Sequence, residues 1–351
     1  ARIIYVGETH DNPAAHRLQL QLLQAVAARY PGQVSVAMEM FNPTQQEVLD
    51  RWVAGELDEK AFLKEVNWFS SWKMDFAYYA EILRFARESQ IPVIGLNATR
   101  EMVQQVGRYN LDELDEELRQ QLPEFNLDDT YQNAMVEAIY ADHSQGKAML
   151  DGFQRIQTLW DETMAENIVK ALKDKGNEHH MVVMAGGNHV RYGYGIPRRV
   201  YHRLPTSYVL VGSREIIVPK EKQDKLMDVE LPTFPMVPYD YILYTEYESL
   251  PGDRVKLGVR MKEEDGKVIV EAVVPNSTAD KAGVLGGDVI VSLDEVLIED
   301  SFDLVYEISQ RISGDQSTLI VEREEKQLSL DVIFIPLPEA DNHGMGGKHK
   351  K

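Results

Sequence analysis

The sequence predicts an α/β fold: a mainly parallel sheet with helices on both faces and a long helical insertion, followed by a small α+β domain. Over the first two thirds of the chain, short apolar runs of strand length alternate with longer stretches of helical periodicity. The last third has short runs separated by turn residues. At 351 residues the chain is longer than one hydrophobic core usually grows, so we expect two domains.

Five strands are expected in the first domain, because five short apolar runs lie between helical stretches. The runs cover residues 2–6, 34–39, 91–96, 181–185 and 207–211. Asn12-Pro13 and Pro43-Thr44 are typical helix starts and follow the first two runs. Residues 99–176 have helical periodicity and no strand, so they form the candidate lid. Strands separated by helices imply right-handed crossovers and hence parallel pairing.

The domain boundaries follow from local composition. We assign the α/β domain to residues 1–240, a linker to 241–253, the second domain to 254–337 and a disordered tail to 338–351. The linker is expected there because prolines are too frequent between residues 213 and 253 for a helix.

Charge and cysteine content exclude several classes of function. The formal charge is -20, from 37 basic and 57 acidic residues, which disfavours nucleic acid and anionic membranes as general partners. Without cysteine, the chain has no disulfide, thiolate nucleophile or thiolate metal site. No apolar run reaches about 18 residues, so we expect no transmembrane segment in this chain. The start at Ala1, with neither an initiator Met nor a leader, is consistent with a removed export signal.

A repeated Gly-x-x-His pattern follows two of the predicted strands. Gly7 begins the first copy, which contains Glu8 and ends at His10, and the second copy ends at His189. Glu39 follows the second strand. Because binding sites collect at the carboxyl edge of a parallel sheet, we expect these four polar side chains to meet there.

Three interpretations of this group remain open. His10, Glu39 and His189 suit a divalent metal such as Zn, Mn or Co, with a coordination position left for water. Glu8, His10, Glu39 and His189 equally suit metal-free acyl transfer, in which a carboxylate raises the basicity of an imidazole. The third interpretation is a hydrogen-bonded cluster that only closes the end of the sheet. Gln157 and Asp161, four residues apart on a predicted helix, are candidates to reach the same edge, and the alternative is a solvated helix face.

A segment rich in arginine, tyrosine and glycine points to a second kind of ligand. Tyr192 and Tyr194 lie among Arg191, Arg198 and Arg199. Nearby positive charge lowers the pKa of a tyrosine, and tyrosinate is a haem ligand. The arginines are candidates to hold propionates. The alternative is an ordinary loop, in which Tyr and Arg beside glycine are common.

The second domain resembles a PDZ domain of the bacterial protease-associated kind. The likeness lies in Leu257-Gly258-Val259, residues 275–279, Lys281-Ala282-Gly283-Val284 and residues 286–290. It implies capture of a peptide or protein C-terminus, with Leu257, Gly258 and Val259 as the carboxylate loop and with Phe302 and Tyr306 on the opposite wall. The alternative is a domain that only packs on its neighbour.

Residues 1 to about 240 resemble the haem-binding uptake proteins of ChaN type, a branch of the Tiki superfamily. The residues that carry the likeness are Gly7 to His10, Met38-Glu39-Met40, Trp160-Asp161-Glu162 and Gly186 to Pro197. The resemblance implies a haem cofactor, a role in haem or iron uptake, and a homodimer with haem between two subunits. It also implies an exported protein, either periplasmic or an outer-membrane lipoprotein.

Two other functions stay open beside haem binding. The wider superfamily includes metal-dependent peptidases and relatives of erythromycin esterase, which implies a possible hydrolase at Glu8, His10, Glu39 and His189. A third interpretation is a non-catalytic PDZ adaptor. Whether the chain is an enzyme is therefore not decided by the sequence.

Overall fold

The computed structural model describes residues 1–140, 147–173, 175–220, 231–252 and 254–336. The chain divides into two compact units, with the boundary between Ser249 and Leu250. The predicted tail lies outside the described residues. No helix within the described ranges is long and apolar enough to cross a membrane.

The first unit is built on a six-stranded sheet in the order β3-β2-β4-β1-β5-β6, and all its pairings are parallel. The strands are β1 (Ile3–Glu8), β2 (Val34–Met38), β3 (Val93–Gly95), β4 (His180–Gly186), β5 (Tyr208–Ile217) and β6 (Tyr241–Glu246). The predicted parallel α/β fold is confirmed.

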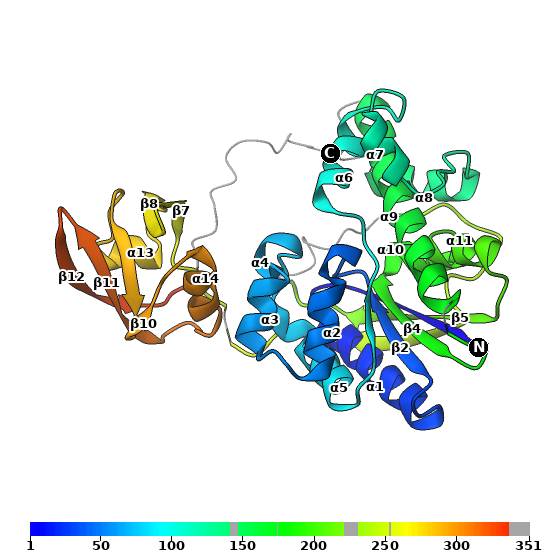
Figure 1. Ribbon diagram of the computed structural model, residues 1–351, viewed down its shortest axis with the longest axis horizontal. Helices are drawn as coiled ribbons and strands as arrows, with labels where there is room; N and C mark the ends of the chain where they lie inside the picture. The colour runs from blue at the N-terminus through cyan, green and yellow to red at the C-terminus, as the bar shows by residue number, and fades with distance from the viewer. Residues whose placement is uncertain (141–146, 174, 221–230, 253, 337–351) are drawn as a thin grey trace. The chain divides into compact units, whose positions relative to one another are not determined.

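Helices connect the strands, as Figure 1 shows. Those before the predicted insertion are α1 (Pro13–Arg29), α2 (Gln46–Ala54), α3 (Glu59–Glu65), α4 (Trp68–Ser71) and α5 (Ala80–Glu88). The insertion forms α6 (Arg100–Arg108), α7 (Glu116–Gln121), α8 (Thr130–Tyr140) and α9 (Lys147–Lys173). Between β4 and β5 lie α10 (Gly187–Val190) and α11 (Ile196–Arg203).

The sheet has a helical layer on each face. Met164 and Ile168 of α9 and Ile196 of α11 pack in one apolar cluster with Tyr5 and Val183 of the sheet. Helix α1 contacts β1, β2, β4 and β5 but contributes no residue to that cluster, because it covers the opposite face. The helix after β1 and the helices after β4 therefore diverge to opposite faces. In open parallel sheets such a divergence leaves a crevice beyond the carboxyl ends of the strands.

The sixth strand was not expected from the sequence. Residues 241–246, which the sequence analysis assigned to the linker, form β6 and pair with β5 from Val211 onward. The frequent prolines end at Pro238 in this region, so six residues without proline remain free to pair. The segment belongs to the first unit.

The second unit contains an antiparallel sheet in the order β12-β11-β9-β8-β7. Its strands are β7 (Val259–Glu264), β8 (Lys267–Val273), β9 (Val289–Leu293), β11 (Gln316–Arg323) and β12 (Lys326–Ile333), and the short β10 (Val296–Leu297) pairs with β9. Helices α13 (Thr278–Ala282) and α14 (Ser301–Ser309) complete the unit. Leu304 of α14 packs on Val268 and Leu319 in its core.

Candidate functional site

The ends of three neighbouring strands bring the predicted site residues together. Glu8 at the end of β1 lies opposite Gly186 at the end of β4, and the Glu39 N–H donates to the Met184 carbonyl of β4 at 3.1 Å. His10 follows β1, and His189 lies on α10 directly after β4. Parallel register therefore places Glu8, His10, Glu39 and His189 at one edge of the sheet, as the repeated pattern predicts.

His10 is held by a buried carboxylate. Its Nδ1 lies 2.6 Å from Oε1 of Glu8, whose side chain is completely buried. The other oxygen of Glu8 is 3.2 Å from Nδ1 of His16, and the Tyr79 hydroxyl donates to Glu8 at 3.1 Å. Because Nδ1 is engaged, Nε2 is the ring nitrogen of His10 that remains for a ligand.

His189 is held in the same way from the opposite layer. Its Nδ1 lies 2.7 Å from Oδ1 of Asp161 on α9, and its Nε2 lies 3.5 Å from Oε1 of Glu39. Gln157 places its amide 3.0 Å from the same Nδ1. The predicted reach of Gln157 and Asp161 to the strand ends is what the structure shows.

Opposite charges therefore alternate in the order Glu8, His10, Glu39, His189, Asp161. We call these five residues the charged row. Burial alone would lower the pKa of His10, but the hydrogen bond to Glu8 and the charges of Glu39 and Glu8 outweigh it and raise the pKa to about 9. Burial would also lower the pKa of His189, yet Glu39 and Asp161 raise that pKa to about 10. Both imidazoles are cations at neutral pH.

The same coupling keeps the carboxylates charged. Burial would raise the pKa of Glu8, but His16 and His10 hold that pKa well below its usual range. The pKa of Glu39 is lowered despite burial, by His189 and His10 and by the Gly186 N–H, which donates to Oε2 at 2.7 Å. Each cation of the row thus lies between two carboxylates, which compensates most of the buried charge.

Glycine is required where the row meets the backbone. A Cβ on Gly186 would lie 3.1 Å from both Cε1 and Nε2 of His10. A Cβ on Gly195 would lie 2.3 Å from the His189 carbonyl oxygen and 3.0 Å from Asp161. A side chain at either position would displace a histidine of the row.

A cavity of about 870 Å³ opens over the row. Four of the five row residues line it, Asp161 being the exception, and aromatic rings form part of its walls. Trp72 meets the His10 ring edge to face at 5.1 Å, and Trp160 meets the His189 ring at 5.9 Å. Other lining residues are Met40, Phe41, Ile139, Tyr140, Arg100, Arg191 and Glu215. The size lies within the range of about 300–1,000 Å³ typical of cofactor and small-molecule sites.

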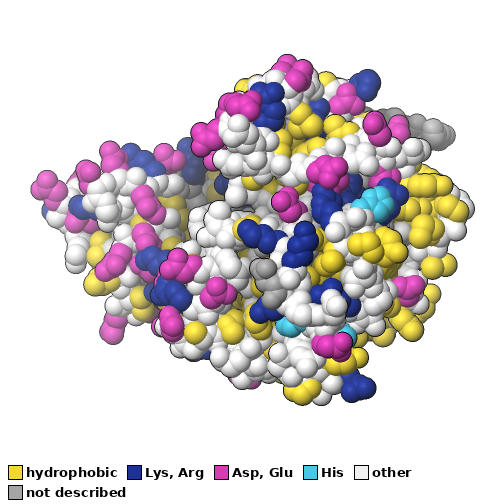
Figure 2. Space-filling model, turned by 45° about the vertical axis from the view of Figure 1, so that its right-hand side comes forward, with side chains coloured by type: hydrophobic (Ala, Val, Ile, Leu, Met, Phe, Trp, Pro, Cys, Tyr) yellow, Lys and Arg dark blue, Asp and Glu magenta, His cyan; other side chains and the backbone are white. Residues whose placement is uncertain are grey.

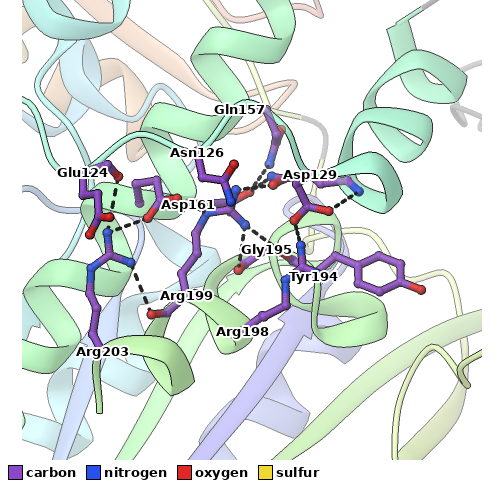
Figure 3. A network of polar contacts seen from close by, with 12 residues as sticks. Glu124, Asn126, Asp129, Gln157, Asp161, Tyr194, Gly195, Arg198, Arg199 and Arg203 are labelled. Carbon is purple, nitrogen blue, oxygen red and sulfur yellow. Dashed lines mark hydrogen bonds and ion pairs between the residues drawn. The ribbon is translucent and has the colours of Figure 1, made fainter. Parts of the chain in front are cut away.

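The structure separates the predicted Arg and Tyr residues. Arg191 lines the cavity, whereas Tyr192, Tyr194, Arg198 and Arg199 do not. Arg198 forms an ion pair with Asp129, and Arg199 pairs with Glu162 at 2.9 Å. Figure 3 shows both arginines in a polar network that includes Asp161 and Gln157. They hold the insertion to α11, since Arg199 also donates to Gln132 of α8, which in turn donates to Asp161.

The two tyrosines pack as an aromatic stack. The Tyr192 and Tyr194 rings lie 5.7 Å apart, and Tyr131 stacks on Tyr194 at 5.1 Å. Burial and the neighbouring Tyr131 and Tyr192 raise the pKa of Tyr194. The expectation that nearby arginines would lower it is wrong here, because Arg198 is neutralised by Asp129. Tyr194 is therefore a neutral phenol with only 2% of its surface exposed.

Three residues that support the site were not expected from the sequence. His16, Tyr79 and Gln132 contact the row, and they lie six to seventy-one residues from the partners they hold. His16 and Gln19 are buried on α1. The apolar periodicity predicts that Leu18 is buried there, but Leu18 is not among the buried residues of this helix. The sequence signal that could have identified His16 is its position three residues before Gln19, which places both polar side chains on one face of the helix that follows Glu8.

The metal interpretation gains no geometric support. No group of three or more His, Asp and Glu side chains in the described part of the chain is arranged to hold a metal ion. The assignment of His10, Glu39 and His189 as metal ligands stays a prediction.

In the second unit, the predicted peptide-site residues lie at the start of β7 and on α14, which contact each other. Gly258 has φ +84°, so the Leu257-Gly258-Val259 turn depends on glycine. The Ser301 N–H donates to Glu263 of β7 at 2.8 Å, which joins the start of α14 to the strand. Phe302 and Tyr306 of α14 stack at 5.9 Å. Among the described strands, β7 pairs only with β8 and is an edge strand.

Comparisons with protein families match both units. A family model described as haem-binding uptake, Tiki superfamily, ChaN matches residues 1–200, and a PDZ-domain model matches residues 255–334. Both matches fall on the segments for which the sequence predicts these families.

Individual relatives are distant. The chain is 22% identical to the chloroplastic protein RETICULATA-RELATED 5 of Arabidopsis thaliana over 92% of this chain, and it spans 44% of that relative's length. A solved structure titled as cofacial haem binding to ChaN of Campylobacter jejuni is 20% identical, with a TM-score of 0.49 over 61% of this chain and 82% of that one. The HtrA-type protease AlgW with a decapeptide is 23% identical, with a TM-score of 0.23 over 24% of this chain and 30% of that one.

The charged row predicts how stability depends on pH. The raised pKa values of His10 and His189 add stability that is complete below about 6.5 and is lost as pH rises through about 9 to 10. Asp161→Asn removes one negative neighbour of His189, so the loss between pH 7 and 10 should be smaller than in the parent. Denaturant unfolding followed by tryptophan fluorescence measures this in the first unit, which holds all four tryptophans.

Asp112→Asn is the matched control, since Asp112 is exposed. It should follow the parent curve. If the free energy of unfolding of the parent and of Asp161→Asn falls equally between pH 7 and 10, a protonated His189 is contradicted.

Proposed function

We propose a haem-binding function from the premise that the chain belongs to the haem-binding uptake family of ChaN type in the Tiki superfamily. The cavity over the charged row is the proposed site. A PDZ domain follows it in the chain. The role in haem or iron uptake, the homodimer and the exported location are carried over from the family as parts of the same proposal.

The observation that supports this site is the combination of aromatic walls and an available imidazole. Trp72 and Trp160 offer flat apolar surface inside a cavity of about 870 Å³. Planar apolar ligands are held by such walls, while a few polar groups fix their orientation. The residues present therefore fit a macrocycle.

His10 is the proposed iron ligand. Its Nδ1 is held by Glu8, as the second nitrogen of an iron-ligating imidazole commonly is, and its side chain is 38% exposed. Haem bound here would supply an iron centre, and His10 would hold the iron through its Nε2. Since the His10 pKa is about 9, binding requires loss of a proton, so affinity should increase with pH below that value.

Titration with haemin tests the proposal. The parent protein should give a saturable shift of the Soret band, and His10→Ala should abolish the shift or weaken binding at least tenfold. Trp72→Ala should weaken binding without changing the ligand signature of the spectrum. Tyr241→Ala, at a ring 68% exposed on β6, is the control and should bind as the parent does.

The alternative iron ligands are the two tyrosines predicted from the sequence, Tyr192 and Tyr194. If Tyr192→Phe with Tyr194→Phe removes the shift and His10→Ala keeps it, the iron ligand is a tyrosine outside the cavity. If the parent itself gives no saturable shift, haem binding is refuted.

Hydrolysis of an ester or peptide is the second candidate function. The pairing of His189 with Asp161 at 2.7 Å favours it, because an imidazole oriented by a carboxylate suits proton transfer. At a pKa of about 10, His189 would begin as a general acid at neutral pH. Glu39, 3.5 Å from Nε2, is the adjacent base.

Hydrolysis of activated esters and of a peptide mixture, with and without Zn²⁺ or Mn²⁺, tests this candidate. His189→Gln should reduce the rate about a hundredfold or more. Equal rates in the parent, His189→Gln and His10→Gln would exclude the row from catalysis.

The PDZ domain is proposed to capture a peptide C-terminus by adding it to the free edge of β7. Its carboxylate would be bound by the backbone of the Leu257 to Val259 turn. If binding occurs here while the first unit shows neither haem binding nor hydrolysis, the adaptor interpretation is favoured.

Fluorescent peptides with free or amidated C-termini test this site on the full chain. Free peptides should bind and amidated ones should not, and Tyr306→Ala should weaken binding about tenfold through lost apolar contact. Leu297→Ala, at a residue 65% exposed on β10, should have no effect. Equal binding of free and amidated peptides would contradict carboxylate capture.

A further inference from the structure

Several arginines of this acidic chain form ion pairs with carboxylates. The chain has 57 acidic against 37 basic residues, so a carboxylate is seldom far away. Arg17 with Glu248, Arg51 with Glu65 and Arg323 with Asp288 are examples. An arginine that lines a cavity, has no acidic partner among the described residues and has a buried nitrogen without an acceptor is informative in such a chain.

Arg191 and Arg100 are two such arginines, and both line the cavity over the charged row. Neither forms an ion pair with any residue in the described ranges. Arg100 begins α6 and is exposed, whereas Arg191 is partly buried and follows α10. Figure 2 shows Lys and Arg side chains gathered near the centre of one face, beside hydrophobic ones.

The contacts of Arg191 leave part of its guanidinium unsatisfied. Its Nη2 lies 3.5 Å from where a Cβ on Gly187 would stand, and its guanidinium lies close enough to Tyr239 to act on the pKa of that hydroxyl. Burial raises the pKa of Tyr239, so that hydroxyl is neutral. The Nε of Arg191 is buried with no acceptor among the described residues. A buried N–H of a charged group destabilises the fold when no acceptor is present. A bound ligand that supplies an acceptor removes this cost.

The carboxylates that line the cavity are already engaged. Glu8 is bound by His10, and Glu39 lies beside His189 and accepts from Gly186. Glu215 accepts from the Asn12 side chain at 2.8 Å. Within the described part of the chain, none of them forms an ion pair with Arg100 or Arg191, so the positive charge there is available to an anion from outside.

We propose that Arg191, assisted by Arg100, forms an anion subsite that selects planar aromatic ligands carrying a free carboxylate. The planar guanidinium fork matches the two oxygens of a carboxylate, and the aromatic walls hold the apolar body. The subsite rests on the proposed function insofar as haem is its ligand, and it names the feature of the ligand that this cavity recognises.

Two pairs of probes separate the subsite from haem binding. The first pair is metal-free protoporphyrin IX and its dimethyl ester, and the second is pyrenebutyrate and its methyl ester. Binding to the full chain is followed by ligand fluorescence, which needs no iron. The free acids should bind about tenfold to a hundredfold more tightly than the esters, as expected for charge-assisted hydrogen bonds.

Variants locate the effect. Arg191→Gln should weaken binding of the free acids at least tenfold and leave binding of the esters unchanged, so that the two affinities converge. Arg191→Lys should retain part of the difference in affinity. Arg100→Gln, at an exposed residue that the fold tolerates, should give a smaller loss. Arg214→Gln, at an exposed arginine of β5 outside the cavity, is the control and should match the parent.

Each outcome is decisive. Equal binding of acids and esters by the parent overturns the subsite and leaves haem binding intact. Preference for pyrenebutyrate, lost in Arg191→Gln, without binding of metal-free protoporphyrin supports the subsite, and the haemin titration then decides haem binding separately. Failure of all four probes to bind overturns the subsite, whereas the haem proposal is overturned only if haemin also fails to bind.

Discussion

Three buried carboxylates at one end of a parallel sheet impose the main constraint on this structure. Glu8, Glu39 and Asp161 are each at most 6% exposed, and a buried charge without a partner is strongly destabilising. Two histidines between them provide the compensation, so every row residue except the terminal acids has an opposite charge on both sides. Removal of one partner from such a pair typically costs about 3–5 kcal/mol. Loss of one residue of the row therefore destabilises the others.

The surrounding layers hold this row from both sides of the sheet. Helix α1 supplies His16 to Glu8, whereas α9 supplies Asp161 to His189. Gln132 and Arg199 extend the second support into α8 and α11 (Figure 3). The floor of the cavity is thus charged, while Trp72, Tyr140 and Trp160 contribute aromatic surface to its walls. This division suits a ligand with an apolar body and a polar contact at the floor, and it accommodates either iron ligation or proton transfer.

The parallel sheet and the meeting of His10 with His189 were predictable, because strand ends of one direction must share an edge. The partner that each individual side chain contacts was not predictable. Arg198 and Arg199 have the same local composition whether they face a ligand or an acid, and only α8 and α9 decide that they bind Asp129 and Glu162. His16 was hidden because its partner, Glu8, lies in a different element. The linker assignment failed at β6, where nearby prolines obscured a short pairing segment.

The protonation of the two row histidines is the most direct test of the account. Ring ¹⁵N NMR of histidine-labelled protein, assigned with His10→Gln and His189→Gln, reports it for each of the two rings. At pH 7 the account predicts imidazolium signals with both nitrogens protonated, persisting until pH approaches about 9 for His10 and about 10 for His189. Neutral rings at pH 7, with titration near the ordinary value of about 6.5, would contradict the charged row.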